Sequence, residues 1–397
     1  MSGSKWLAGL VVAACFAISI SPAVGMNTLD RMLQNGMSNL VYVYIAGCIS
    51  GVVLVPYLTH ALKRLAGYLF LSKDEGGHDL YRLDHGILNV EMPPASMWMN
   101  IGFWEQTTSF PAACRGLLDE VLMAAGLLGP DRIPFGQSKT TRLRVIDLGF
   151  GCGDQSIYLT QLARKIRQPG DSTTDSPTHY FLDSYVGLTI VPSQFRFANE
   201  RLYSSSNKNG SRVKLFCADA AKPWTWTKDL HEAATDTSTK GDGADVTPTT
   251  SNQATWVLAL DTLYHFIPSR EPIFRHTFRE LNASIMAFDL LLSDTLSIWD
   301  LLLLRLVSFF AATPFSNFLT ITEYRNQLLA AGYDRNKVEI RDISDHVFAG
   351  MASFIERRDG ELKNTGMTIG RYKAAGKVFK WWARSGIVRG CIIVARR

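Results

Sequence analysis

The stretch Arg144-Val-Ile-Asp-Leu-Gly-Phe-Gly-Cys-Gly-Asp-Gln155 carries the signals that determine the fold of this 397-residue chain. Its apolar start, Val145 to Leu148, has the composition of a buried parallel strand. Three alternating glycines follow: Gly149, Gly151 and Gly153. Glycine tolerates positive φ and lets the backbone come close to a ligand. With a helix expected from Gln155 towards Ile166, the stretch predicts a crevice for a nucleotide-like ligand, with the Asp147 carboxylate facing it.

The spacing of the glycines distinguishes between families of nucleotide site. The dinucleotide-binding turn has the form G-x-G-x-x-G, whereas this one reads G-x-G-x-G, and the Lys-Ser/Thr pair of a phosphate-binding loop is absent. The D-x-G-x-G-x-G form followed by Asp-Gln resembles motif I of class I S-adenosylmethionine-dependent methyltransferases of the small-molecule, methyltransferase-11 or sterol-tocopherol type. That resemblance implies S-adenosyl-L-methionine as cofactor. Asp147 would approach its methionyl amino group, and the glycine turn would pass under its sugar and sulfonium.

The composition argues against other classes of function. A net charge of +5 and a pI near 8.8 are too mild for a nucleic-acid-binding surface, and no basic run is dense enough to follow a phosphate backbone. We therefore expect no nucleic-acid partner. The 6 cysteines are scattered and form no C-x-x-C pair or cluster with histidine, which predicts neither a metal site nor a disulfide framework.

The first 65 residues predict a membrane anchor. Trp6 to Val24 is almost wholly apolar and is typical of a spanning helix or of a signal peptide. Leu40 to Leu58 contains no charged residue and is long enough to cross the hydrocarbon core. Lys63 and Arg64 follow, so the positive-inside tendency predicts a catalytic domain that faces the cytosol from the endoplasmic reticulum or another endomembrane. The alternative is two buried helices, although the second run lacks the polar face that such a helix should carry.

A cap region is expected between the anchor and motif I. The segment Met99-Asn-Ile-Gly-Phe-Trp104 precedes an amphipathic helix predicted over 112–128. This arrangement resembles the segment that closes over the cofactor in small-molecule methyltransferases. The resemblance implies that Asn100, Phe103 and Trp104 line the substrate side, with simple core packing of the aromatic rings as the alternative.

The next two strands supply further cofactor contacts. A strand is predicted over Tyr185–Ile190, and the position near its end where nucleotide folds commonly have an acid for the ribose hydroxyls holds Thr189. The G-x-T-x-x-x-x-Q pattern matches a variant seen in methyltransferases related to the sterol, tocopherol and cyclopropane-forming groups, and implies contacts from Thr189 and Gln194. A third strand, starting at Val213, leads into Asp219 and Ala220. By the same resemblance, Asp219 accepts a hydrogen bond from the adenine amino group.

The strongest cluster for acid–base chemistry follows the fourth strand. Val257 to Leu260 suits a central parallel strand beside the first, and Asp261, Tyr264 and His265 emerge at its carboxyl end, where open α/β sheets bind ligands. Histidine accepts a proton near neutral pH, and tyrosine can position a nucleophile. We therefore predict His265 and Tyr264 as catalytic and Asp261 as a cofactor contact. A hydrogen-bonded structural role for His265 is the alternative.

Two further regions differ in polarity. Residues 228–253 are rich in Thr, Asp, Gly and Ser and are expected to form a surface loop. Residues 296–315 are strongly apolar, but Asp300 and Arg305 interrupt them, so a spanning helix is not expected. The segment predicts an interfacial helix, a lid over the acceptor or an ordinary buried helix. Thr322 is predicted to cap the helix that follows and stops at Gly332.

Together these features predict a membrane anchor over 1–65, an N-terminal cap region over 66–140 and an S-adenosylmethionine-binding catalytic domain over 141–397. The resemblance covers roughly Asn100 to Arg397 and implies an α/β, Rossmann-like sheet of seven strands, mostly parallel with an antiparallel last strand. It implies an enzyme that methylates a small acceptor, and the anchor with the apolar segment indicates a lipophilic one in contact with membrane lipid. A dinucleotide-dependent reductase and a catalytically silent, membrane-anchored binding protein of this fold stay open as alternatives.

Overall fold

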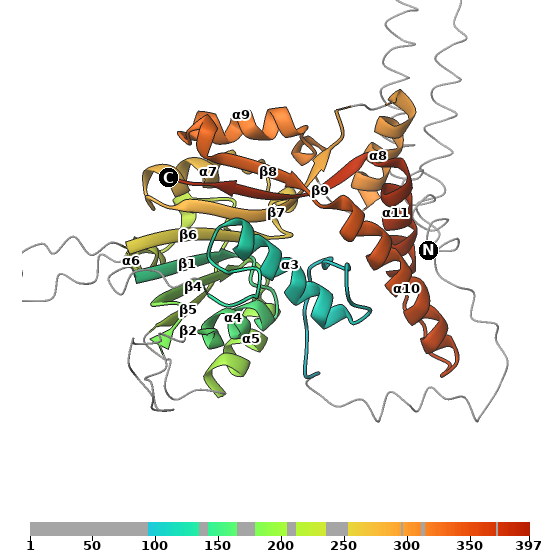
Figure 1. Cartoon of the computed structure of the whole chain (residues 1–397), viewed down its shortest axis with the longest axis horizontal. Coiled ribbons are helices and arrows are strands. Elements are labelled where there is room, and N and C mark those ends of the chain that lie inside the picture. The colour runs from blue at the N-terminus through green and yellow to red at the C-terminus, as the bar shows by residue number, and fades with distance from the viewer. Residues whose placement is uncertain are drawn as a thin grey trace, which may run out of the picture. The chain divides into compact units, whose positions relative to one another are not determined.

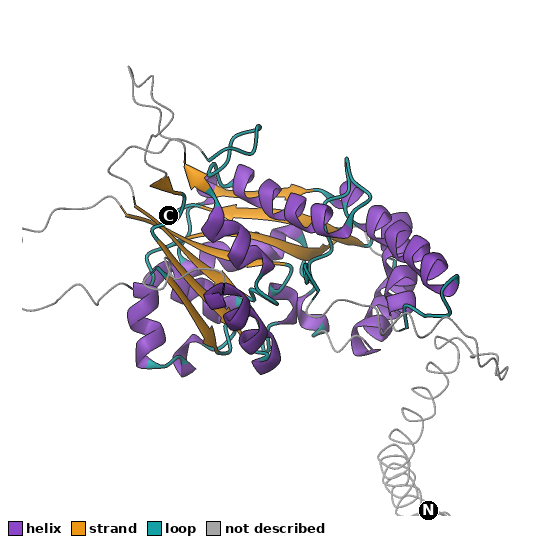
Figure 2. Ribbon diagram, turned by 90° about the horizontal axis from the view of Figure 1, so that it is seen from below, coloured by secondary structure: helices purple, strands orange, loops and turns teal. Residues whose placement is uncertain are grey.

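The architecture is a seven-stranded sheet with helices on both faces (Figures 1 and 2). The computed structural model describes residues 94–134, 142–164, 179–204, 212–235, 253–294, 297–310, 314–370 and 372–397. The strand order is β5-β4-β1-β6-β7-β9-β8. These strands are β1 (Arg142–Leu148), β4 (Ser184–Thr189), β5 (Val213–Cys217), β6 (Gln253–Leu260), β7 (Ser284–Leu292), β8 (Val338–Asp342) and β9 (Val388–Ala395). The pairs from β5 to β7 are parallel, and β9 is antiparallel to both β7 and β8. The predicted Rossmann-like sheet of seven strands is confirmed.

Alternating side chains of the strands build two separate cores. On β1, Val145 belongs to one core and Ile146 to the other, and both are fully buried. Leu258 and Val257 on β6 divide in the same way. Successive residues of a strand point to opposite faces, so a strand covered on both faces is apolar without interruption. This explains the unbroken apolar run at 257–260 and the apolar residues Val145, Ile146 and Leu148 around the buried Asp147.

The helices cover the two faces and one end of the sheet. They are α3 (Phe110–Ala124), α4 (Asp154–Gln161), α5 (Pro192–Ser204), α6 (Lys228–Thr235), α7 (Glu271–Arg279), α8 (Ile298–Phe310), α9 (Ile321–Ala331), α10 (Phe348–Lys363) and α11 (Tyr372–Ser385). Residues of α3 and α4 belong to one core, and residues of α6, α7 and α9 to the other. In Figure 1, α8, α10 and α11 lie together beyond the N-terminal end of β9.

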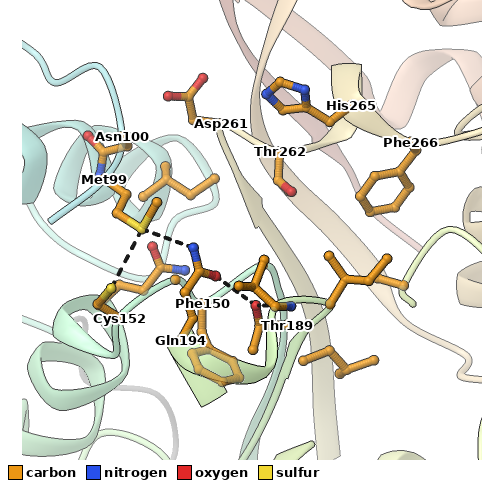
Figure 3. A pocket seen from close by; sticks show the side chains of 18 of the residues that line it. Met99, Asn100, Phe150, Cys152, Thr189, Gln194, Asp261, Thr262, His265 and Phe266 are labelled. Carbon is orange, nitrogen blue, oxygen red and sulfur yellow. Dashed lines mark hydrogen bonds between the residues drawn. The ribbon is translucent and has the colours of Figure 1, made fainter. Parts of the chain in front are cut away.

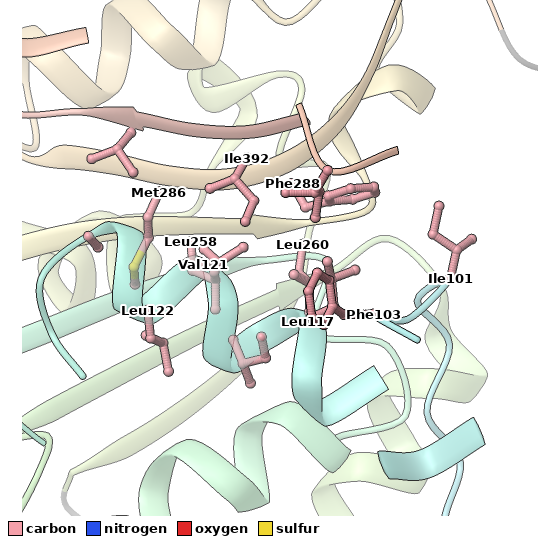
Figure 4. Packing of buried hydrophobic residues seen from close by; sticks show 14 of the residues in the cluster. Ile101, Phe103, Leu117, Val121, Leu122, Leu258, Leu260, Met286, Phe288 and Ile392 are labelled. Carbon is pink, nitrogen blue, oxygen red and sulfur yellow. The ribbon is translucent and has the colours of Figure 1, made fainter. Parts of the chain in front are cut away.

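The predicted amphipathic helix over 112–128 forms as α3. Its fully buried face, Leu117, Val121 and Leu122, packs over strand residues such as Leu258 and Phe288 (Figure 4). Each buried side chain of this kind contributes about 1.5–3 kcal/mol relative to an exposed one. The helix therefore fixes the preceding cap segment, residues 97–104, to the sheet.

Three local expectations were wrong. The helix after motif I ends at Gln161, not near Ile166, because the chain turns into β2 (Ala163–Arg164), which pairs with β3 (His179–Tyr180). Within the expected loop over 228–253, residues 228–235 form α6, whose Leu230 packs in the core. The helix cap is Thr320, not Thr322: its hydroxyl accepts from the Glu323 N–H while the Glu323 carboxylate accepts from the Thr320 N–H.

The predicted membrane anchor lies outside the described residues. Both apolar runs, Trp6–Val24 and Leu40–Leu58, belong to that part of the chain. Within the ranges that the structure describes, no helix combines the length and apolarity that spanning a bilayer requires.

Candidate active site

A cavity of about 510 Å³ opens at the carboxyl ends of the central strands. Its size falls within the range of small-molecule sites, about 300–1,000 Å³. It lies between the turn after β1, the ends of β4 and β5, the loop after β6 and the cap segment. Ten of the predicted site residues line it: Asn100, Gly149, Gly151, Thr189, Gln194, Asp219, Ala220, Asp261, Tyr264 and His265. Figure 3 shows Thr189 and Gln194 on one side of the cavity, and Asp261 and His265 on the other.

The glycine turn forms the floor of this cavity. Gly149 and Gly151 have φ values of 90° and 64°, in the left-handed region that favours glycine. A Cβ on Gly149 would lie 2.7 Å from the Thr262 hydroxyl oxygen, and one on Gly151 would lie 3.3 Å from the Met99 sulfur. The absence of side chains at these two positions therefore lets Thr262 and Met99 lie against the turn at the cavity. Gly153 does not line the cavity; a Cβ there would lie 2.8 Å from that of Ala198, so this glycine lets α4 pack against α5.

Asp147 lies beneath the glycine turn and does not line the cavity. It is fully buried, and its carboxylate accepts hydrogen bonds from the Gln155 amide at 2.8 Å and the Tyr185 hydroxyl at 2.5 Å. Burial raises its pKa to about 6, although these two hydrogen bonds favour the ionised form. In the structure, Asp147 ties α4 and β4 to the end of β1, whereas the sequence predicted a direct contact with the cofactor.

Asp261 is the carboxylate that faces the cavity. One oxygen accepts from the Ile101 N–H at 2.9 Å, and the other, Oδ1, is buried without a hydrogen-bond partner. Its φ of 59° is rare for a residue with a side chain, and such strain is concentrated at functional sites. Burial raises its pKa to about 7, against the effects of the Tyr264 hydroxyl and the Ile101 N–H. An unpaired acceptor at a cavity wall fits a ligand that donates a hydrogen bond.

Residues at the ends of β4 and β5 form the other side of the cavity. The Thr189 hydroxyl donates to the Gln194 side-chain oxygen at 2.8 Å, and the Gln194 amide lies 3.4 Å from the Met99 sulfur. Asp219 accepts from the Ala221 N–H at 2.9 Å and pairs with Lys222 at 3.0 Å. Thr189 and Gln194 hold each other in place, as do Asp219 and Lys222, and all four residues line the cavity.

The cap segment is held over the glycine turn by two connections. The Asp154 carboxylate accepts from the Met97 N–H at 3.1 Å and from Arg201 on α5 at 2.7 Å. Further along, the Asn100 side chain donates to the Cys114 carbonyl and accepts from the Gly102 N–H. The segment thereby brings Met97, Trp98, Met99 and Asn100 into the cavity wall.

Two predicted substrate-side residues point away from the cavity. The Trp104 ring packs 5.3 Å from the ring of Phe354 on α10, and the Phe103 ring lies 4.9 Å from that of His346. Neither side chain lines the cavity. The structure thus gives both the core-packing role that the sequence left open: they fasten the cap segment to α10 and the loop before it.

Tyr264 and His265 lie in the short helix η4 (Leu263–His265), directly after Asp261. Their ring centroids are 4.2 Å apart. Burial, followed by the Asp261 carboxylate, raises the pKa of Tyr264 well above its usual value, so its hydroxyl stays protonated. His265 is more exposed, and partial desolvation lowers its pKa. Its imidazole is therefore neutral at pH 7 and able to accept a proton.

Several cavity residues were not predicted from the sequence. Met99, Gln155 and Thr262 line the cavity beside the glycine turn, and Phe266 and Ile267 line it beyond His265. Gln155 stands inside motif I, so its position carried a local signal. Met99 and Thr262 carried none, because each reaches the turn from a distant part of the sequence.

Comparison with known proteins identifies similar folds only. No protein-family model and no curated protein matches the sequence. A putative sarcosine dimethylglycine methyltransferase from Galdieria sulphuraria has 12% identity and a TM-score of 0.49, over 75% of this chain and 92% of that one. The cyclopropane synthase MmaA2 from Mycobacterium tuberculosis has 13% identity and a TM-score of 0.48, over 75% and 90%. A geranyl diphosphate C-methyltransferase from Streptomyces coelicolor A3(2), in complex with S-adenosyl-L-homocysteine, has 15% identity and a TM-score of 0.42, over 72% and 82%.

The seven-stranded sheet, with β9 antiparallel to both of its neighbours, is the fold that the resemblance of motif I to class I S-adenosylmethionine-dependent methyltransferases implies. The cofactor that this resemblance implies is S-adenosyl-L-methionine. The cavity is compatible with such a ligand, because the Gly149 and Gly151 backbone and the Asp261 side chain line it. Fold similarity at this level carries no information on the acceptor.

Proposed function

We propose that this chain transfers a methyl group from S-adenosyl-L-methionine to a small, lipophilic acceptor at a membrane. The observation that carries the cofactor part is that the glycine turn after β1 and the Asp261 carboxylate line one cavity. When bound, the cofactor supplies an electrophilic methyl group on its sulfonium, so the protein's own residues have to bind, orient and deprotonate.

The carboxylates of this site divide into a structural and a ligand-binding one. Asp147 is engaged by Gln155 and Tyr185 and does not line the cavity, whereas Asp261 does line it. We therefore assign the cofactor's amino group to Asp261. Thr189 and Gln194 are positioned for the ribose hydroxyls, and Asp219 is the acceptor for the adenine amino group, with Ala220 beside it. These assignments follow the order of the predicted motifs.

His265 is proposed as the base for a hydroxyl or amine acceptor. The imidazole of His265 is neutral at physiological pH, and the residue lines the cavity. It is the last residue of η4, whose first residue, Leu263, is buried. Tyr264, which stays protonated beside it, donates a hydrogen bond and does not take the proton. Both assignments depend on the acceptor reaching the His265 side of the cavity, where Phe266 and Ile267 give the wall an apolar character.

The cofactor assignment is tested by calorimetry on the full-length chain in detergent. S-adenosylhomocysteine is expected to bind, and NADH is expected not to bind, because the turn lacks the dinucleotide spacing. Tighter or equal binding of NADH would favour the reductase alternative. Incubation with methyl-labelled cofactor and a membrane lipid extract then separates an enzyme from a silent binding protein: absence of label in every extracted product would favour the latter.

The lipophilic part of the proposal is supported by the exposed face of α8. Six large apolar residues of this helix are 38–81% exposed: Ile298, Trp299, Leu301, Leu302, Leu303 and Leu306. Soluble surfaces rarely carry such a contiguous patch, and a bilayer surface is one environment that buries it. In sequence, the domain is connected through residues 59–93 to the uncharged Leu40–Leu58 run, which we propose as its membrane anchor.

Serine substitution of Leu302 and Leu306 together is expected to raise the KM for a lipid-dispersed acceptor roughly tenfold or more, since two apolar contacts are lost. The cofactor affinity should not change, because neither residue lines the cavity. Ile133→Ser is the matched control, as Ile133 is similarly exposed (56%) but belongs to no such patch. An enzyme that methylates only small polar amines, and is indifferent to the α8 changes, would contradict the lipophilic proposal.

A further inference from the structure

A buried side-chain amide holds the backbone on both sides of His265. Asn317, in the short helix η5 (Phe315–Asn317), is only 2% exposed. Its Nδ2 donates to the carbonyl oxygen of Tyr264 at 3.2 Å and to that of Phe266 at 2.5 Å. These two carbonyls flank His265 in sequence. The amide therefore connects the loop after β6 to η5, which lies about 50 residues further along the chain.

The backbone of Asn317 is held by Arg270, which forms a buried ion pair with Asp289. The Arg270 guanidinium donates to the Asn317 carbonyl oxygen at 2.7 Å and lies 4.9 Å from the Tyr324 ring centre. Its Nε is 3.4 Å from Asp289 Oδ2, and both side chains are fully buried. The other oxygen of Asp289 accepts from the Leu290 N–H at 2.9 Å.

A buried ion pair is a weak source of stability, because taking both charges out of water costs about as much as their attraction returns. Burial raises the pKa of Asp289, and the opposite effect of Arg270 does not cancel this. The directional contact here is the hydrogen bond from Arg270 to the Asn317 carbonyl oxygen, whereas Arg270 and Asp289 form an ion pair without a hydrogen bond. Asn317 in turn donates to the two carbonyls beside His265.

We propose that Asn317 is a positioning residue, held by Arg270 and Asp289, that keeps His265 at the cavity wall. This proposal rests on the function proposed for His265. Within the short helix that contains His265, the His265 N–H donates to Thr262 and the Phe266 N–H to Leu263. The start of the loop is joined to β7 by the Asp261 N–H, which donates to the Phe288 carbonyl oxygen, and Asn317 adds a second connection at the two carbonyls that flank His265.

Asn317→Asp is the sharpest test, because it keeps the size of the side chain and replaces the donor with an acceptor that faces two carbonyls. In the full-length chain, we expect turnover into a membrane lipid extract to fall about tenfold or more, with unchanged affinity for S-adenosylhomocysteine. In a His265→Ala background, the same change should lower turnover less than about twofold, because the residue it positions is gone. Asn317→Ala serves as the second variant if Asn317→Asp does not fold.

Two controls separate positioning from general destabilisation. Leu328→Ala, at a fully buried position of α9, should lower the melting temperature without changing turnover well below the transition. Backbone hydrogen exchange over 263–267 should quicken in Asn317→Asp but not in Leu328→Ala. Equal losses of turnover with and without His265, or unchanged exchange in this loop, would overturn the positioning role. Faster exchange in Asn317→Asp together with full activity of His265→Ala would instead show that Asn317 holds this loop and that His265 is not the base.

Discussion

Asp261→Asn is expected to weaken binding of S-adenosylhomocysteine by roughly 100-fold, because it removes the charged partner of the ligand's ammonium group in a site shielded from water. Asp261 lines the cavity, whereas Asp147, the other acid of the predicted site with a raised pKa, does not. Calorimetry of the full-length protein at pH 8 measures the effect directly. Affinity unchanged within about threefold would refute the assignment of the amino group to Asp261.

The same contact predicts a pH dependence of binding. The pKa of Asp261 is about 7 without ligand, so below that pH its proton has to leave before the ammonium group can pair with it. Affinity should therefore fall by up to about tenfold per pH unit as the pH drops below 7, and Asp261→Asn should flatten this profile. The linked stability has the opposite trend. A raised carboxyl pKa favours the folded protein in acid, and that contribution is lost as the pH rises from about 4 to 7.

Asp147→Asn is the matched control for this prediction. Asp147 has a raised pKa of about 6 as well, but both its oxygens are already engaged inside the protein. This change should lower the melting temperature, since one of the two carboxylate oxygens that accept from Gln155 and Tyr185 becomes a donor amide. The affinity for S-adenosylhomocysteine should change only to the extent that the glycine turn above Asp147 becomes less ordered. If Asp147→Asn weakened binding more than Asp261→Asn without a change in stability, the direct contact first expected for Asp147 would be restored.

His265→Ala is expected to lower turnover by roughly 100-fold or more while the affinity for the cofactor stays nearly unchanged. The imidazole lines the cavity, and its lowered pKa keeps it neutral, which a general base requires. Turnover should fall on the acid side as His265 becomes protonated, and this acid limb should be absent in the variant. The measurement is a pH profile of label transfer into the lipid extract.

A structural role for His265 predicts a different result. In that case His265→Ala would lower the melting temperature and the cofactor affinity together, and the acid limb would persist. His265→Gln supplies a comparison, because it keeps hydrogen-bonding capacity at this position but cannot take a proton. Recovery of full turnover by glutamine would contradict the base assignment.

How far the sequence predicted the site follows from how local each signal is. The apolar run at 145–148 and the glycines after it identify a strand and a turn without reference to any other residue. The positions of Thr189, Asp219 and Asp261 follow because each comes just after a strand, and parallel strands bring their carboxyl ends to one edge. The sheet order needed the family resemblance, since periodicity alone does not say which strands are neighbours.

The roles of the two acids, in contrast, depended on contacts between distant residues. Asp147 lies near the end of β1 and Asp261 directly after β6, and the glycine motif after Asp147 predicts a nearby ligand without showing which acid reaches it. Tyr185, 38 residues from Asp147, takes up the first carboxylate, while the Ile101 N–H, 160 residues from Asp261, leaves one oxygen of the second free. Only the packed sheet brings these groups together.

What the sequence by itself determined about this protein is the strand, turn and helix of motif I, the edge of the sheet where a ligand binds, and the composition of the apolar segments. The tertiary structure decided which acid faces the cavity, that Phe103 and Trp104 pack against α10 and the loop before it, and that Asn317 holds the carbonyls around His265. The physical reason is that backbone preference and periodicity act over a few residues. Burial and hydrogen-bond partners are assigned only when segments far apart in the chain compete for the same space.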